Sequence, residues 1–217
     1  MIDYLQALVK SQLGHDVLDA AQIYSGNSRV FKLHCANEVS FIAKVYPAED
    51  HVARDRLGAE FGALSFLWEQ GIRAVPQPLY ADDGHRTAIY SFIPGDNINT
   101  DRIGTQDIDA AVGFIHALAD LRTHRQSVTL SDASEACFSH ACHLDRICKR
   151  LQLLDNIGEE TTYHTQARLL IQESFLPLFD RIKRETCRRL TELDIDPADE
   201  LDIAYRTLSP SDFGFHN

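Results

Sequence analysis

A change in residue patterning near Pro94-Gly95 constrains the fold of this chain more than any other feature. Before this point, β-branched and aromatic residues form short runs that are typical of strands. These runs lie at residues 24–33, 39–46 and 87–93. Between the second and third runs, residues 55–70 carry apolar side chains at helical spacing, and Gly71 stands where a C-terminal cap glycine is expected. The first part of the chain therefore predicts a small antiparallel sheet with one packed helix.

After Pro94-Gly95 the apolar spacing becomes helical. Helices are expected over residues 107–122, 134–154 and 159–193, and Pro177 is expected to divide the last of them. Asp196-Pro197 predicts the start of another helix, with Asp196 as its N-cap. We therefore expect an α+β chain of two lobes. Residues 1–93 would form the strand-rich lobe and residues 94–217 the helical lobe.

The charge balance limits the classes of partner. The 217 residues include 21 Lys and Arg against 32 Asp and Glu, which gives a net charge of 21 − 32 = −11. Such an acidic chain argues against a nucleic-acid or anionic-membrane surface. The N-terminus lacks the basic and apolar regions of an export signal, and the five cysteines are odd in number and irregularly spaced. We expect a reduced, cytoplasmic protein.

Two segments of the first lobe suggest phosphate binding. A turn of small residues, Gly26, Asn27 and Ser28, could offer backbone N–H groups to phosphate oxygens, although by itself an ordinary hairpin turn is the simpler explanation. Lys44 lies within an apolar strand, where an unpaired ammonium would be costly to bury. Glu60 on the following helix can be its partner. The alternative is that Lys44 faces solvent on a half-buried strand.

Two later segments suggest a nucleotide and a reaction. The strand ending in Tyr90-Ser91-Phe92-Ile93 runs into Pro94-Gly95, and its backbone could pair with the edge of a purine. Near the end, Asp212 and Asn217 stand five residues apart around Gly214. A carboxylate can accept a proton from an attacking hydroxyl, and an amide oxygen can bind Mg²⁺.

The order of these parts resembles that of eukaryotic-type kinases. More closely, the chain resembles the aminoglycoside phosphotransferase and choline kinase-like family, which has the protein kinase fold. That family uses a short turn with one glycine, as at Gly26, and the segment 209–217 resembles a variant of its catalytic loop. The resemblance implies an ATP-dependent kinase that phosphorylates a hydroxyl of a small molecule. It is strongest at residues 41–60 and 208–217.

The resemblance also implies roles for single residues. Lys44, oriented by Glu60, would hold the α- and β-phosphates of ATP, while Ser91 and Ile93 would offer backbone groups to adenine. Asp212 would orient and deprotonate the acceptor hydroxyl. Asn217 would bind Mg²⁺.

Two departures from the family's pattern keep another function open. Pro210 stands where the family has a scaffold histidine, and the family's further metal-binding Asp, some 15–20 residues after the loop Asn, has no counterpart here. We therefore expect a truncated chain with little activity by itself. The alternative is a non-catalytic nucleotide-binding or interaction module derived from such a kinase.

Other clusters give weaker hypotheses. Cys137, His140, Cys142 and His143 suggest zinc, but their spacing matches no closed four-ligand site. The mixed charges over residues 181–189 predict a solvated helix face. Acidic residues beyond Pro94-Gly95 favour a cationic alcohol as the acceptor, although an acidic surface also serves solubility. They are Asp96, Asp101, Asp107 and Asp109.

Overall fold

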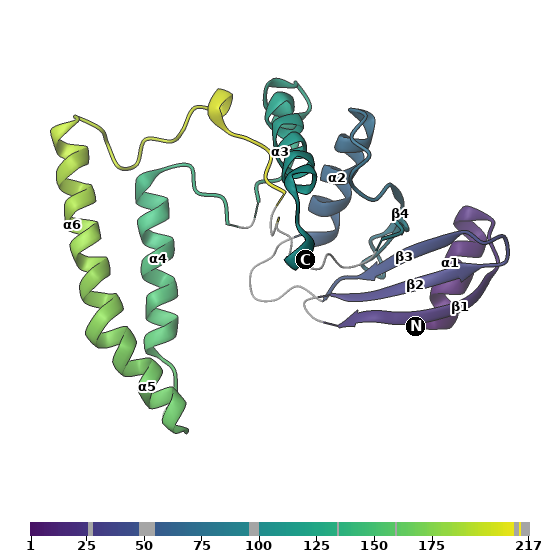
Figure 1. The fold of residues 1–217 in the computed structure, drawn as a ribbon, viewed down its shortest axis with the longest axis horizontal. Helices are drawn as coiled ribbons and strands as arrows, with labels where there is room; N and C mark the ends of the chain where they lie inside the picture. Colours follow the sequence, from purple (N-terminus) through teal and green to yellow (C-terminus); the bar gives the residue numbers. More distant parts are fainter. Residues whose placement is uncertain are drawn as a thin grey trace. The chain divides into compact units, whose positions relative to one another are not determined.

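The structure is a computed structural model that describes residues 1–25, 28–47, 55–95, 100–133, 135–158, 160–210 and 213 (Figure 1). Within these residues, five strands form one antiparallel sheet in the order β1-β2-β3-β5-β4. The strands are β1 (Val17–Ser25), β2 (Arg29–Cys35), β3 (Ser40–Val45), β4 (Pro78–Asp82) and β5 (Thr87–Ser91). The expected α+β class with a small antiparallel sheet is confirmed. The strand run predicted at residues 24–33 corresponds mainly to β2, and the sequence analysis missed the part of β1 before Tyr24.

One face of the sheet is covered by α1 (Ile2–Leu13), a helix that the sequence analysis missed. Leu5 and Val9 of α1 are fully buried. They belong to one apolar cluster with inward-facing residues of β2, β3 and β5, which are Phe31, Leu33, Cys35, Phe41, Ala43, Val45 and Ile89. Gly14 ends α1 at φ 76°, a left-handed conformation that glycine adopts without a steric penalty.

The other face packs against α2 (Arg56–Glu69). Leu57 and Phe61 of α2 join Tyr46 and Tyr90 in a second apolar cluster. Asp55 caps the helix, because its side chain accepts a hydrogen bond from the Gly58 N–H at 2.7 Å. Gly71, at φ 85°, follows the helix as the sequence predicted. Period-two alternation along the strands thus separates two cores, and each has its own helix.

The later helices are α3 (Thr105–Asp120), α4 (His140–Asp155), α5 (Thr162–Leu170) and α6 (Leu176–Glu192). Short 3₁₀ turns lie at Thr100–Arg102, Leu121–Thr123, Ser127–Thr129 and Ile203–Tyr205. The expected division of the long third segment is present as a π-helical turn, Ile171–Phe175, just before Pro177. The missing proline N–H explains why the regular hydrogen-bond ladder is interrupted at this place.

Two boundaries differ from the sequence expectation. α4 begins at His140 rather than at residue 134, because the Ser139 side chain caps it by accepting from the Cys142 N–H at 3.1 Å. The helix expected from Asp196 is absent from the described residues, and that prediction is wrong. Asp196 instead accepts from the Ala198 N–H at 2.9 Å within a turn, so its capping side chain closes a local loop.

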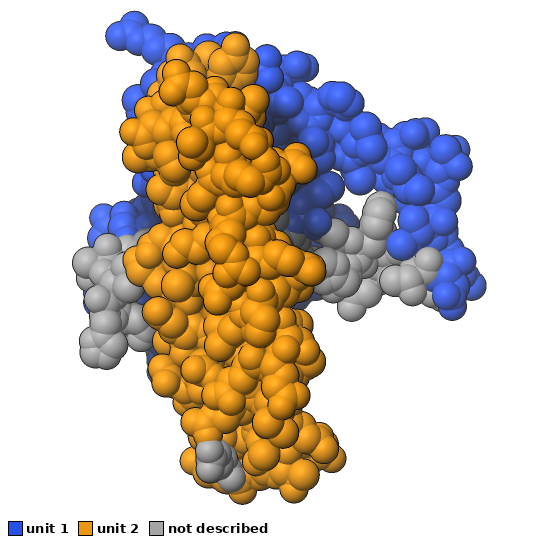
Figure 2. All heavy atoms as spheres, turned by 90° about the vertical axis from the view of Figure 1, so that its left-hand side faces the viewer, with its two compact units in different colours: residues 1–133, 207–217 blue, residues 134–206 orange. Residues whose placement is uncertain are grey.

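The chain divides into two compact units, coloured separately in Figure 2. The first comprises residues 1–133 with 207–217, and the second comprises residues 134–206. The proposed lobe boundary at residue 94 stays a prediction. Of the helices in the described residues, none combines the length and apolarity needed to cross a membrane.

Candidate nucleotide-binding site

Lys44 faces α2 because its strand neighbours face the other way. Ala43 and Val45 are buried in the α1-side core, so alternation directs Lys44 to the opposite face of β3. There its ammonium Nζ lies 2.8 Å from Oε1 and 2.6 Å from Oε2 of Glu60, which α2 presents. The Lys44 side chain is 26% exposed and the Glu60 side chain is 36% exposed. The partner that the sequence analysis assigned to Lys44 is therefore in contact with it, and the pair remains accessible to a ligand.

The strand register places an apolar surface beside this ion pair. Lys44 pairs with Val30 on β2 and with Ala88 on β5, and one row further along Ile42 pairs with Lys32 and Tyr90. Directly paired residues share a face of the sheet. Val30 and Ile42 are half-buried, whereas Ala88 is fully buried. The sequence analysis did not assign Val30 and Ile42 to the site, although counting in twos from Lys44 along β3 would have found Ile42.

Two tyrosines meet next to Lys44. The hydroxyl oxygens of Tyr46 and Tyr90 lie 2.8 Å apart in the buried layer against α2, and the Lys44 ammonium lies 5.1 Å from the centre of the Tyr46 ring. Burial raises the pKa of both tyrosines, and the nearby Glu60 carboxylate raises it further. Both hydroxyls therefore stay protonated. The sequence analysis gave neither residue a role.

In the segment that leaves β5, the Ser91 and Phe92 amides donate to backbone carbonyls and the Ile93 amide does not. The Ser91 N–H donates to the Gln77 carbonyl at 2.9 Å, and the Ser91 hydroxyl accepts from the Gln77 N–H at 2.8 Å. Because the N–H and the hydroxyl of Ser91 are both bonded to Gln77, its backbone carbonyl oxygen is the group that could contact a ligand. Among the described residues, no backbone carbonyl accepts from the Ile93 N–H.

Several predicted site residues lie outside the described residues. They are Gly26, Asn27, Asp212 and Asn217. Ser28 is described and half-buried, just before β2. Phe213, which follows Asp212, packs against Phe114 of α3 with ring centres 5.4 Å apart. This contact holds Phe213, the residue that follows the predicted catalytic Asp212 in the sequence, against α3.

The acidic residues assigned to substrate attraction are not equivalent. Asp107 lies in the first turn of α3, and its carboxylate accepts from the Gly104 N–H at 2.9 Å. Asp107 therefore caps this helix. Asp109 is exposed, Asp101 lies in a 3₁₀ turn, and Asp96 lies outside the described residues.

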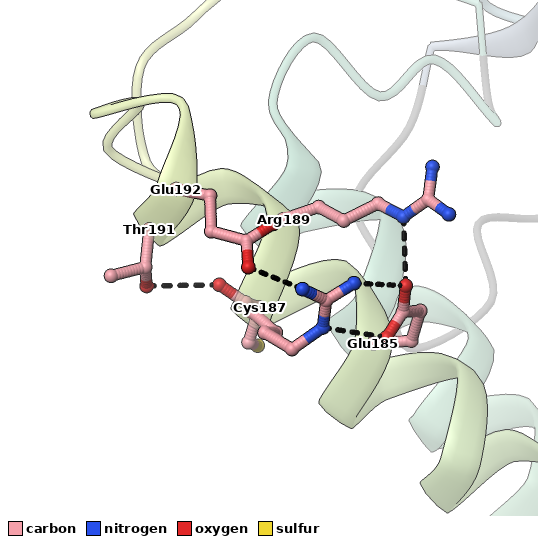
Figure 3. A network of polar contacts seen from close by, with 6 residues as sticks. Glu185, Cys187, Arg189, Thr191 and Glu192 are labelled. Carbon is pink, nitrogen blue, oxygen red and sulfur yellow. Dashed lines mark hydrogen bonds and ion pairs between the residues drawn. The ribbon is translucent and has the colours of Figure 1, made fainter.

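In the second unit, residues 181–189 form the charged face of α6 that the sequence predicted. Glu185 accepts from Arg188 and from Arg189, and Arg188 also contacts Glu192 (Figure 3). These arginines lower the pKa of Glu185 to about 2. A shallow groove runs along this face between Arg181 and Arg189. Of the residues that line the groove, Glu185 and Arg189 are already paired with each other, so their charges are largely neutralised.

The described residues hold no cluster of metal-binding side chains. No group of three or more His, Cys, Asp or Glu side chains converges within the part of the chain that the structure describes. The zinc hypothesis at Cys137, His140, Cys142 and His143 therefore has no geometric support. What this segment does show is a close approach of two thiols, with the sulfur atoms of Cys137 and Cys142 3.4 Å apart.

Comparisons with known proteins identify the fold. No family model matches the sequence, and the search of curated proteins gave no match. Among solved structures, spectinomycin phosphotransferase, crystallised with ADP and spectinomycin, matches 90% of this chain and 59% of its own length, at 16% identity and a TM-score of 0.58. A candidate aminoglycoside phosphotransferase from Ralstonia eutropha matches 73% of this chain and 49% of its own length, at 14% identity and a TM-score of 0.50.

This chain spans between 38% and 59% of the length of four solved structures that it matches. At these identities the likeness concerns the fold, and the resemblance stated from the sequence is confirmed at that level. The chain has the protein kinase-like α+β fold of the aminoglycoside phosphotransferases.

Proposed function

We propose that this chain binds ATP as part of a phosphotransferase that phosphorylates a hydroxyl group of a small molecule. The observation that carries the proposal is the Lys44–Glu60 ion pair, which remains partly exposed beside the half-buried Val30 and Ile42. An ammonium held at a carboxylate is suited to polyphosphate, and an apolar surface next to it is suited to a flat base. The fold shared with spectinomycin phosphotransferase, a protein crystallised with ADP, supports the same ligand class.

Each residue then has one task. Lys44, oriented by Glu60, holds the α- and β-phosphates, and the turn at Gly26, Asn27 and Ser28 offers backbone N–H groups to phosphate oxygens. The Ser91 carbonyl and the Ile93 N–H pair with the edge of adenine. This arrangement leaves the γ-phosphate as the group to be transferred.

Asp212 acts on the acceptor. Its carboxylate takes the proton of the acceptor hydroxyl as that oxygen bonds to the γ-phosphorus, and ADP leaves with the bridging oxygen. Asn217 is the proposed protein ligand of Mg²⁺, which neutralises phosphate charge when bound. We infer an acceptor alcohol that carries an amine, since Asp101 and Asp109 add negative charge beyond β5.

Calorimetric titration of the chain with ATP, in the presence of Mg²⁺, tests the proposal. Lys44→Ala is expected to weaken ATP binding by about tenfold or more, because the phosphates lose a charge-assisted contact. Lys10→Ala is the matched control. Lys10 lies on α1 and also forms an ion pair with a carboxylate, Asp16, at 2.6 Å. Equal affinities of both variants, or no binding by the unmodified chain, would contradict the proposal.

ADP release separates the two functions left open by the sequence, when it is measured on a form of the protein that includes the further metal-binding Asp. A kinase releases ADP faster when an acceptor is added, and an amine-bearing alcohol should be the better acceptor at low salt. ATP binding with no acceptor-dependent ADP release would instead favour a nucleotide-binding module.

A further inference from the structure

Two cysteine side chains meet at the start of α4. The Sγ atoms of Cys137 and Cys142 are 3.4 Å apart, and both side chains are half-buried. Cys142 lies in the first turn of the helix, where its N–H donates to the Ser139 side chain. Cys137 lies outside the helix, two residues before this cap. Cys142 is therefore held in a regular helical turn, and Cys137 lies in the irregular segment before it.

The distance suits a disulfide better than a metal. A disulfide has an S–S length of ~2.0 Å, so the sulfur atoms would have to approach by about 1.4 Å. Within the described residues no third His, Cys, Asp or Glu completes a metal site here. The other three cysteines have no such partner: Cys35 is buried, Cys148 lies further along α4, and Cys187 is exposed on α6.

We propose that Cys137 and Cys142 form a redox-active dithiol that a small disulfide, such as oxidised glutathione, converts to an intrachain disulfide. In the first step the Cys142 thiolate attacks one glutathione sulfur, and one glutathione thiolate leaves. In the second step Cys137, after losing its proton, attacks the Cys142 sulfur, and the second glutathione leaves. Two protein thiols are oxidised, and one glutathione disulfide is reduced to two thiols. Burial raises the pKa of the Cys137 thiol and so lowers its thiolate fraction, which is why the first attack is assigned to Cys142.

The disulfide would close a turn that anchors another part of the second unit. The Phe138 carbonyl accepts from the Leu201 N–H at 2.6 Å, and the Ala141 N–H donates to the Pro197 carbonyl at 2.8 Å. The Arg206 guanidinium lies 3.8 Å from the centre of the Phe138 ring. Phe138 and Ala141, which make these two hydrogen bonds, lie between the two cysteines in the sequence. Oxidation would therefore rigidify the support of the segment 197–206, which leads into the predicted catalytic loop.

Peptide mapping after equilibration with mixtures of oxidised and reduced glutathione tests the proposal. Trypsin leaves Cys137 and Cys142 together on the peptide 126–146, whereas Cys35, Cys148 and Cys187 each fall on separate peptides. We expect the peptide 126–146 to lose two hydrogens and to resist alkylation. In the folded chain, half-conversion should need a ratio of oxidised to reduced glutathione at least about tenfold lower than in urea, because folding holds the sulfurs together.

Variants sharpen the result. Cys148→Ser, the matched control on the same helix, should leave the conversion unchanged, and Cys142→Ser should leave Cys137 open to alkylation. The same half-conversion ratio for folded and unfolded chain would overturn the proposal. So would single glutathione adducts on Cys142 without the loss of two hydrogens.

Discussion

The hydroxyl groups of Tyr46 and Tyr90 are partners in the buried layer next to the Lys44–Glu60 ion pair, with their oxygens 2.8 Å apart. Tyr46→Phe would leave the Tyr90 hydroxyl without this partner, at a cost of about 1–3 kcal/mol. We expect urea denaturation to show that loss in the free energy of unfolding. The double variant Tyr46→Phe/Tyr90→Phe should lose less than the sum of the single variants, because no orphaned hydroxyl remains from the pair.

Tyr163→Phe is the control for this pair, since the Tyr163 side chain is 82% exposed. Its free energy of unfolding should change by less than about 0.5 kcal/mol. Additive losses in the double variant would show that the two hydroxyls do not depend on each other.

Two glycines of α2 should respond oppositely to alanine. A Cβ on Gly58 would lie 2.0 Å from Asp55 Oδ2, so it would displace the carboxylate that caps the helix. A Cβ on Gly62 meets nothing within 4 Å. We expect Gly58→Ala to lower the free energy of unfolding by about 0.5–1 kcal/mol, and Gly62→Ala to raise it by a similar amount. Thermal denaturation of the two variants measures the difference, and shifts of the same sign would contradict the capping geometry.

Stability at low pH should depend on Tyr4. The Tyr4 hydroxyl donates to Asp82 Oδ2 at 2.7 Å, and with the His85 N–H it lowers the pKa of the Asp82 carboxyl. The folded chain therefore holds a proton on Asp82 less readily than the unfolded chain does. The resulting stabilisation is complete above the unfolded pKa of ~3.9 and is lost as the pH falls through the lower, folded value.

Tyr4→Phe should flatten this acid limb of the stability profile. It should also remove an alkaline limb, because burial and the Asp82 carboxylate raise the pKa of Tyr4 to about 12. That stabilisation is complete below the unfolded pKa of ~10 and declines as the pH rises through the folded value. Urea denaturation between pH 3 and pH 12 measures both limbs. Tyr205→Phe, at a 70% exposed side chain, should leave both limbs in place.

Asp212→Asn tests the role proposed for the catalytic loop. An amide cannot take the proton of the acceptor hydroxyl, so in an active form that includes the further metal-binding Asp, acceptor-dependent ADP release should fall by about 10²–10⁴-fold while ATP affinity stays nearly unchanged. Asp199→Asn, in an exposed turn of the second unit, is the control. A near-normal rate in Asp212→Asn would remove this residue from the mechanism.

Local patterns predicted the parts of the fold that depend on local chemistry. The strand alternation around Lys44, the helical spacing of residues 55–70 and Gly71 all correspond to observed structure. The contact of Lys44 with Glu60 also followed, because an ammonium in an apolar strand needs an anion.

What the sequence analysis missed depends on contacts between distant segments. α1 is amphipathic and short, and the sheet face that it covers is assembled from strands up to 84 residues later in the chain, as the cluster of Leu5 with Ile89 shows. The pairing of Tyr46 with Tyr90 likewise requires the register of β3 and β5. At Asp196 the local signal misled, because the same capping residue serves a turn as readily as a helix.

The position of α1 in the chain has a consequence for biosynthesis. This helix leaves the ribosome before the sheet, and its buried side chains, Leu5 and Val9, have their partners on strands that emerge up to residue 89. Until then its apolar side has no sheet to cover and is open to chaperones. Once Ser91 has emerged, every strand of the described sheet and both of its covering helices are available. The sheet can thus close on both faces before α3 emerges, which shortens the time for which a growing chain exposes unpaired strand edges.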